Sequence, residues 1–226
     1  MATQRFNPHK PTLFFDFDGT LADTIECNFK IFNQLSCLYK HQKITIDQMH
    51  EFRELHISEI LKRLKIGCIR KLFLVMHARL IMNQYIQTIQ PFPGLFEVLL
   101  TFREKFNFAV ISTNSKTNIE YFMIQHSPFC FNLILGGIGV FSKGHAIKKL
   151  MKQEKLQPKT CFYIGDELRD IDLAKFCQIQ SIAVSWGCNS KLALLKAKPD
   201  HLVESAESLQ QVLCLNLDSE FKAVTY

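Results

Sequence analysis

The chain has 226 residues and a mass of 26.2 kDa, the size of one domain or of one domain with a small insertion. Apolar residues make up 47% of it and charged residues 21%, which excludes intrinsic disorder and low-complexity repeats. The net charge of +6 is spread along the chain. We therefore expect no nucleic-acid partner and, instead, an anionic small molecule.

The compartment is predicted from the termini and the cysteines. Residues 1–10 are polar and basic and lack the apolar segment of a secretion signal. None of the apolar runs approaches the roughly 20 residues that span a bilayer. The 8 cysteines form no Cys-x-x-Cys pair, which favours reduced thiols. We expect a cytoplasmic protein without membrane attachment, and the oligomeric state is not indicated.

The first predicted element is a buried strand over residues 12–15, which ends in acidic residues and a glycine. From residue 23 to about residue 89, apolar side chains recur every three or four positions, and no strand-like alternation appears. This spacing predicts an all-helical segment. The segment closes at residues 91–94, Pro-Phe-Pro-Gly, which end one helix and restart the chain.

The second part of the chain alternates between buried strands and helices of about ten residues. We predict strands over residues 108–111, 133–135, 161–164, 181–184 and 201–203. The helices are predicted over residues 95–104, 117–125, 143–154, 168–177, 190–196 and 208–214. This alternation is typical of an α/β fold, a doubly wound parallel sheet with helices on both faces. The domains are predicted as an α/β core of residues 1–21 and 91–226 and an inserted α-helical cap of residues 22–90.

Polar and acidic residues follow each strand that has a strong core pattern. They are Asp16 and Asp18 after the first strand, Ser112, Thr113 and Asn114 after the second, and Gly165, Asp166, Glu167 and Asp170 after the strand at 161–164. Ligands of doubly wound folds bind outside these strand ends. Converging aspartates repel one another, and a bound dication relieves the repulsion. Hard oxygen ligands select Mg²⁺, so we expect a magnesium site.

The same residue types suit phosphoryl transfer. Of Asp16 and Asp18, one carboxylate can attack phosphorus while the other exchanges a proton with the leaving oxygen and the incoming water. Thr113 and Asn114 offer donors for phosphate oxygens. A lysine is still needed to neutralise the charge of the transferring group. Lys143, Lys148 and Lys149 are candidates, and we favour Lys143 because it starts its predicted helix.

These motifs resemble those of the haloacid dehalogenase superfamily, in its phosphoglycolate-phosphatase-like branch. The resemblance rests on Asp-Phe-Asp-Gly-Thr-Leu at 16–21, Ile-Ser-Thr-Asn at 111–114 and Gly-Asp-Glu-Leu-Arg-Asp at 165–170. Pro93-Gly94 is similar to the point where that branch returns from its helical cap. Motif order and spacing match over roughly residues 11–210, and they imply a Rossmann-like core.

The resemblance implies roles residue by residue. Asp16 would be the nucleophile and a magnesium ligand, and Asp18 the general acid and base with its backbone carbonyl on the metal. Asp166 would be the third protein ligand. Thr113 would hold the phosphoryl group beside Asn114, and Lys143 would be the phosphate-binding lysine. Asp170 would be an outer ligand or would orient a metal-bound water or the lysine, and Glu167 could contact such a water.

We therefore predict a magnesium-dependent phosphatase that hydrolyses a small phosphorylated metabolite through an aspartyl-phosphate intermediate. The helical insertion would act as a lid that excludes water and selects the substrate. Two alternatives stay open: a phosphomutase of the β-phosphoglucomutase type, and a non-catalytic binding protein on the same scaffold. Removal of a halide is disfavoured, because that branch of the family lacks the second aspartate.

Overall fold

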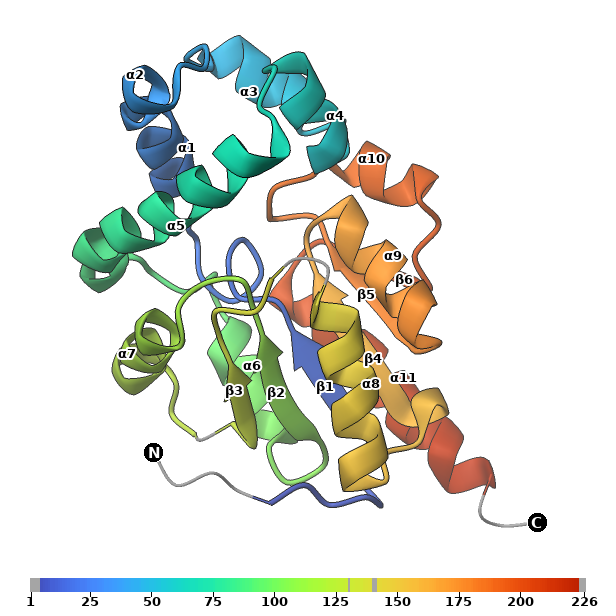
Figure 1. Ribbon diagram of the computed structural model, residues 1–226. Coiled ribbons are helices and arrows are strands. Elements are labelled where there is room, and N and C mark those ends of the chain that lie inside the picture. Colours follow the sequence, from blue (N-terminus) through green and yellow to red (C-terminus); the bar gives the residue numbers. More distant parts are fainter. Residues whose placement is uncertain (1–4, 130, 140–141, 224–226) are drawn as a thin grey trace.

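A six-stranded parallel sheet forms the centre of the protein (Figure 1). The computed structural model describes residues 5–129, 131–139 and 142–223. The strand order is β3-β2-β1-β4-β5-β6. The strands are β1 (Thr12–Phe15), β2 (Asn107–Ile111), β3 (Leu133–Leu135), β4 (Cys161–Gly165), β5 (Gln180–Val184) and β6 (His201–Val203).

The register of the central strands brings their carboxyl ends to one level. Phe15 of β1 lies opposite Val110 of β2 on one side and Ile164 of β4 on the other. The amide of Asp16 donates to the carbonyl of Ile164 at 2.9 Å, so the ladder continues to the first acidic residue. The residues that follow β1, β2 and β4 therefore meet at the same edge of the sheet.

Helices cover both faces of the sheet, as predicted. They are α6 (Leu95–Phe102), α7 (Lys116–His126), α8 (Lys143–Glu154), α9 (Leu168–Cys177), α10 (Lys191–Lys196) and α11 (Ala206–Ala223). Leu13 and Phe15 point to a core with α6, α7 and α11, whereas Phe14 points to a second core with α8 and α9. This side-to-side alternation is what a strand between two helical layers requires. The predicted α/β class is confirmed.

The predicted helical segment contains helices only. These are α1 (Ile25–Gln34), α2 (Ser36–Tyr39), α3 (Ile46–Phe52), α4 (Ile57–Arg63) and α5 (Cys68–Tyr85), followed by a 3₁₀ turn (Ile86–Thr88). They lie as a group beyond the carboxyl ends of the strands (Figure 1). Two small apolar clusters of their own hold them together, one around Ile31 and Leu74 and the other around Phe52 and Leu64.

The helical group joins the sheet through two neighbouring segments. Ala22 forms an antiparallel bridge with Pro91, and the amide of Asp23 donates to the carbonyl of Gln90 at 2.9 Å. The chain therefore leaves the sheet and returns to it at one place. The division into a core of residues 1–21 and 91–226 and a cap of residues 22–90 stays a prediction.

The last helix is longer than predicted. The expected range was residues 208–214, and α11 runs from Ala206 to Ala223. Leu209 and Leu213, inside the predicted range, are fully buried in the core beside the sheet. The helix continues past them, and Leu217, four residues after Leu213, also packs against the core.

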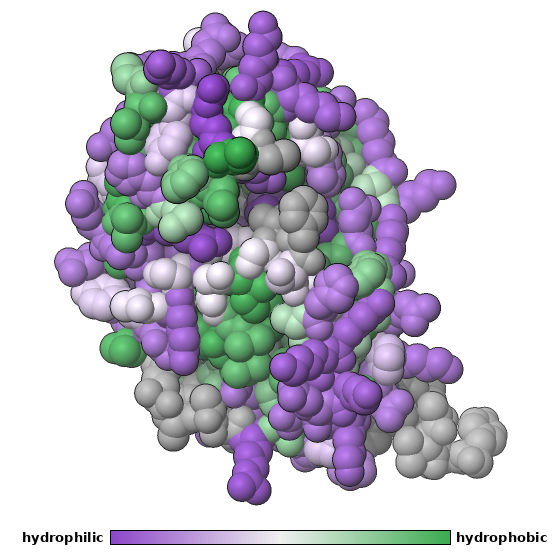
Figure 2. Space-filling view, viewed as in Figure 1, coloured by the Kyte–Doolittle hydropathy of each residue, from purple (hydrophilic) through white to green (hydrophobic). Residues whose placement is uncertain are grey.

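The surface is uneven in polarity. Hydrophilic residues gather over α8, while hydrophobic residues reach the surface over α5 (Figure 2). Among the described residues, no helix combines the length and the apolar character needed to cross a bilayer.

Candidate active site

Asp16 and Lys143 form a buried ion pair at the end of β1. The Oδ2 atom of Asp16 accepts from Nζ of Lys143 at 2.7 Å, and its Oδ1 atom accepts from the amide of Phe17 at 2.7 Å. Both side chains are only 4% exposed. Lys143 also donates to the hydroxyl of Tyr163 at 3.2 Å, and burial raises the pKa of that phenol, so it stays neutral.

The position of Lys143 at the start of α8 explains its reach. As the first residue of the helix it points its ammonium group toward the strand ends. Lys148, one of the other two candidates, is exposed, and its Nζ lies 3.8 Å from the centroid of the Phe176 ring. Lys149 is exposed as well. Of the three lysines considered, only Lys143 contacts an acid of the site.

Asp18 is held from two directions. The amide of Asn114 donates to both of its carboxylate oxygens, at 3.0 and 3.2 Å. The hydroxyl of Thr24, at the start of α1, forms a second side-chain hydrogen bond with it. Burial, together with the charge of Asp16, raises the pKa of Asp18 to about 6. The protonated form of Asp18 is therefore accessible near neutral pH, as a proton donor requires.

Each of these two partners of Asp18 is itself held by an asparagine. Asn118 of α7, which is buried, donates through Nδ2 to Oδ1 of Asn114 at 3.0 Å. Asn28 of α1 donates through Nδ2 to the hydroxyl of Thr24 at 3.2 Å. The hydrogen bonds through Asn118 and Asn114 come from the α/β core, and those through Asn28 and Thr24 come from the helical group. Asp18 therefore lies where the two parts of the molecule meet.

Asp166 follows β4 in a tight pocket of backbone. Its Oδ1 accepts from the hydroxyl of Thr20 and its Oδ2 from the amide of Cys188, both at 2.7 Å. A Cβ added at Gly19 would lie 2.2 Å from Oδ2 of Asp166, and one added at Gly187 would lie 2.1 Å from its Cβ. Gly19 also has a φ of +75°, which other residues rarely adopt. Two glycines thus form a cradle that fixes this carboxylate.

Glu167 and Asp170 lie at the start of α9, Glu167 at the N-cap and Asp170 in the first turn. Asp170 is buried, and its Oδ2 accepts from the amide of Glu167 at 3.0 Å. Burial, followed by the charge of Asp16, raises the pKa of Asp170 to about 7. Glu167 pairs with Arg169 at 2.5 Å, and neither side chain is fully exposed. Asp170 therefore acts partly as a helix cap, in addition to any role toward the acids beside it.

The acids form a donor set that fits Mg²⁺. Burial, followed by the charges of Glu167, Asp170 and Asp16, raises the pKa of Asp166 well above its usual range. A dication would remove this repulsion. Among the described residues, no three acidic, histidine or cysteine side chains are placed to ligate one ion together. Magnesium is usually bound by only one or two carboxylates and keeps several waters, and Asp16 and Asp166 together would supply that number.

Thr113 differs from the other predicted site residues. It follows β2 and is half-buried, and within the described part of the chain its hydroxyl makes no hydrogen bond. Its neighbour Asn114 is bound to Asp18. The structure therefore brings together Asp16, Asp18, Asn114, Lys143, Asp166 and Asp170, with Glu167 at the edge. Thr113 lies next to them with an unused donor.

Several residues that build the site were not predicted. Thr20 and Gly187 fix Asp166, while Thr24 and Asn118 act on Asp18. Thr20 lies inside the first motif, so its position alone could have suggested it. The other three carry no signal in the sequence, because their roles depend on how separate loops meet.

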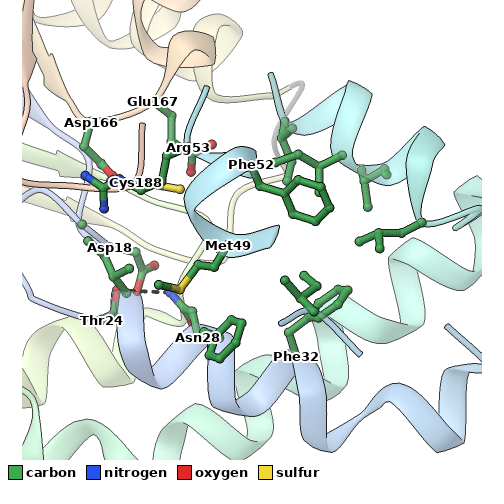
Figure 3. Close-up of a pocket in the computed structure, with 18 residues that line it drawn as sticks. Asp18, Thr24, Asn28, Phe32, Met49, Phe52, Arg53, Asp166, Glu167 and Cys188 are labelled. Atoms are coloured by element: carbon green, nitrogen blue, oxygen red, sulfur yellow. Dashed lines mark hydrogen bonds between the residues drawn. The ribbon is translucent and has the colours of Figure 1, made fainter. Parts of the chain in front are cut away.

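A cavity of about 240 Å³ opens beside these acids and continues into the helical group (Figure 3). Asp18, Asp166 and Glu167 line one end of it. Phe32, Met49 and Phe52 line the other end. Arg53 lies at the acidic end, beside Glu167 and Cys188 (Figure 3).

The sheet, the acids at its carboxyl edge and the inserted helices define an α/β enzyme with an oxygen-rich site. The sequence profile of the family described as haloacid dehalogenase-like hydrolase matches residues 13–184. The chain belongs to this family. The resemblance seen in the motifs is thus confirmed, as is the prediction that the protein is an enzyme.

Comparisons with individual proteins agree with this membership. A phosphoglycolate phosphatase from Synechococcus elongatus is 28% identical over 203 residues, which are 89% of this chain and 96% of that protein. A protein described as a predicted phosphatase from Clostridium acetobutylicum has the same fold, with a TM-score of 0.77, 18% identity, and coverage of 91% of this chain and 98% of its own. A haloacid dehalogenase-like family protein from Streptococcus pneumoniae aligns with a TM-score of 0.74 at 19% identity, over 90% and 98% of the two chains.

Proposed function

We propose that this hydrolase is a magnesium-dependent phosphatase, which cleaves a small phosphorylated metabolite through an aspartyl phosphate on Asp16. The observation that carries the proposal is the buried pair of Asp16 and Lys143, with Asp18 held two residues further on by Asn114. A nucleophile, a cation and a proton donor at one strand edge are the groups that phosphoryl transfer needs. The phosphatase names of related proteins also support it.

In the first half-reaction, a carboxylate oxygen of Asp16 attacks phosphorus, and the bond from phosphorus to the ester oxygen breaks. Asp18 gives its proton to the leaving oxygen, which departs as the alcohol. Lys143 neutralises negative charge on the phosphoryl group during the transfer. Thr113, whose hydroxyl has no hydrogen-bond partner among the described residues, would donate to a phosphoryl oxygen.

In the second half-reaction, a water molecule displaces the Asp16 carboxylate from phosphorus. Asp18 takes a proton from the water as its oxygen attacks phosphorus, the bond to Asp16 breaks, and inorganic phosphate leaves. Asn114 and Thr24 keep the Asp18 carboxylate in place for both steps.

Asp16 and Asp166, with the backbone carbonyl of Asp18, would hold Mg²⁺. When bound, Mg²⁺ neutralises the charge of the acids and of the phosphate. Asp170 and Glu167 would act from the outer shell, because Asp170 is engaged with the start of α9. Residues 22–90 would form the cap that closes over this site.

The test compares Asp16→Asn with Asp23→Asn, since Asp23 is exposed and lies outside the site. With p-nitrophenyl phosphate and Mg²⁺, we expect Asp16→Asn to lower kcat by at least about 10³-fold and Asp23→Asn to leave it unchanged. Mass spectrometry of acid-quenched wild type should find a phosphoryl group on the peptide that contains Asp16. Dialysis against EDTA should stop hydrolysis, and Mg²⁺ should restore it. Full activity of Asp16→Asn would overturn the assignment.

A further inference from the structure

The cavity at the site has two chemically different ends. Near the acids it is lined by Asp18, Asp166, Glu167 and Arg53. Further into the helical group its walls are apolar, formed by Phe32, Ile44, Met49, Phe52, Ile60 and Leu64. Figure 3 shows the rings of Phe32 and Phe52 on the side away from Asp18 and Asp166, and Met49 lies between these rings and Asp18.

The charge on the walls indicates what the far end can bind. Arg53 is the one cationic residue among the described residues that line the cavity, and it lies beside Asp166 and Glu167 (Figure 3). Within the described part of the chain, no cationic side chain lines the end around Phe52 and Leu64. A carboxylate or second phosphate placed there would lose its hydration without gaining a partner, which is unfavourable.

The cavity volume also favours an apolar ligand. About 240 Å³ holds several water molecules, each of which occupies about 30 Å³ in the liquid. Waters between apolar walls lack the two to four polar partners that stabilise buried water. A ligand whose apolar group displaces these waters binds about fourfold more tightly for each methylene that it buries.

We propose that the leaving alcohol of the substrate carries an apolar group, so that the substrate is an alkyl or aryl phosphate monoester rather than a short acid such as phosphoglycolate. This inference rests on the proposed phosphatase function. The phosphoryl group would lie at Asp16 and Lys143, and the apolar group would extend past Met49 toward Phe52 and Ile60.

The first experiment measures kcat/KM of the wild type with Mg²⁺ for ethyl, butyl and hexyl phosphate and for 2-phosphoglycolate. The alkyl esters share the same reacting bond, so their differences report binding of the chain. We expect kcat/KM to rise on the order of a hundredfold from ethyl to hexyl phosphate, which adds four methylenes. Hydrolysis without this rise, or with 2-phosphoglycolate preferred to hexyl phosphate, overturns the inference and leaves the phosphatase function standing. If none of the esters is cleaved, both proposals fail.

The second experiment fills the apolar end. Ile60→Trp, on α4, should lower the ratio of the hexyl to the ethyl kcat/KM at least tenfold. Met49→Trp, on α3, should act in the same direction and serves as a second variant in case Ile60→Trp does not fold. Ile46→Trp is the matched control, because Ile46 lies on α3 but is 65% exposed and does not line the cavity. A ratio unchanged in a folded Ile60→Trp or Met49→Trp protein would show that the cavity is a packing gap, and would overturn the inference.

Discussion

The ammonium group of Lys143 lies 2.7 Å from Oδ2 of Asp16, although 127 positions separate the two residues in the chain. Both are buried, so each charge depends on the other to offset its lost hydration. The pair connects the first strand with the first turn of α8. It therefore links the stability of the core to the charge balance of the site.

Lys143→Ala should impair both properties. Loss of the ammonium group removes a cation from the transferring phosphoryl group, and we expect kcat to fall by about 10²-fold or more. It also leaves Asp16 without its partner, and breaking a buried pair costs about 3–5 kcal/mol of the free energy of unfolding. Steady-state kinetics and urea unfolding measure the two effects. Lys149→Ala, at an exposed position on the same helix, should change neither, and equal effects in both variants would contradict the assignment.

Asn118→Ala tests the series of side-chain hydrogen bonds that runs from Asn118 through Asn114 to Asp18. Asn118 contacts Asn114 and not Asp18, so it positions the acid through another residue. We expect kcat to fall by roughly tenfold with KM little changed. The Asp18 carboxylate would lose its orientation, whereas the substrate would keep its binding site. The pH profile of kcat should shift with it, an effect that mere loss of stability would not produce. Thr117→Ala, exposed on the same helix, is the control, and a wild-type profile in Asn118→Ala would contradict this role.

The sequence was sufficient to predict the sheet and the main acids for a simple physical reason. Strands β1 and β4 are continuous apolar runs, and parallel strands bring the residues that follow them to one edge. Asp16 and Asp166 meet for that reason alone. Lys143 could be chosen because a residue at the start of a helix points toward the same edge.

The residues that were missed depend on the paths of loops. Asn189 lies in the turn after β5, and the sequence does not indicate that this turn reaches the helical group. Gly187 has no motif that marks it, and its role appears only when its Cα lies against Asp166. The length of α11 was also missed, although Leu217 continues the four-residue spacing of Leu209 and Leu213 and packs against the same core. Hydrophobic periodicity predicts elements, but it does not predict which loops contact one another.

Asn189 joins the helical group to the α/β core. Its Nδ2 donates to the carbonyls of Arg53 and Leu55, at 2.8 and 3.0 Å, and its Oδ1 accepts from the amide of Leu168 at 2.9 Å. Asn189→Ala would remove the partner of the Leu55 carbonyl and of the Leu168 amide, at about 1–3 kcal/mol for each group that stays buried, whereas the Arg53 carbonyl keeps the amide of Ser190 at 2.9 Å. We expect a clear drop in Tm and a lower kcat/KM, because Arg53 lines the cavity.

Thermal unfolding followed by circular dichroism, together with kinetics on one phosphate ester, measures both effects of Asn189→Ala. Lys191→Ala removes an exposed ion pair with Glu204, and a loss within about 0.5 kcal/mol is expected for it. A Tm of Asn189→Ala equal to that of Lys191→Ala would show that the contact between the two parts does not depend on this side chain.

Gly187→Ala tests whether the backbone cradle around Asp166 determines metal binding. The added methyl group would lie 2.1 Å from Cβ of Asp166 and 2.4 Å from its Oδ2, so the carboxylate must move. Because Asp166 is a proposed ligand, we expect the Mg²⁺ concentration for half-maximal activity to rise at least tenfold, within the range seen when residues that support ligands are changed. Gly67→Ala is the matched control, since a Cβ at Gly67 meets no atom within 4 Å. An unchanged Mg²⁺ requirement in folded Gly187→Ala would mean that Asp166 does not ligate the metal.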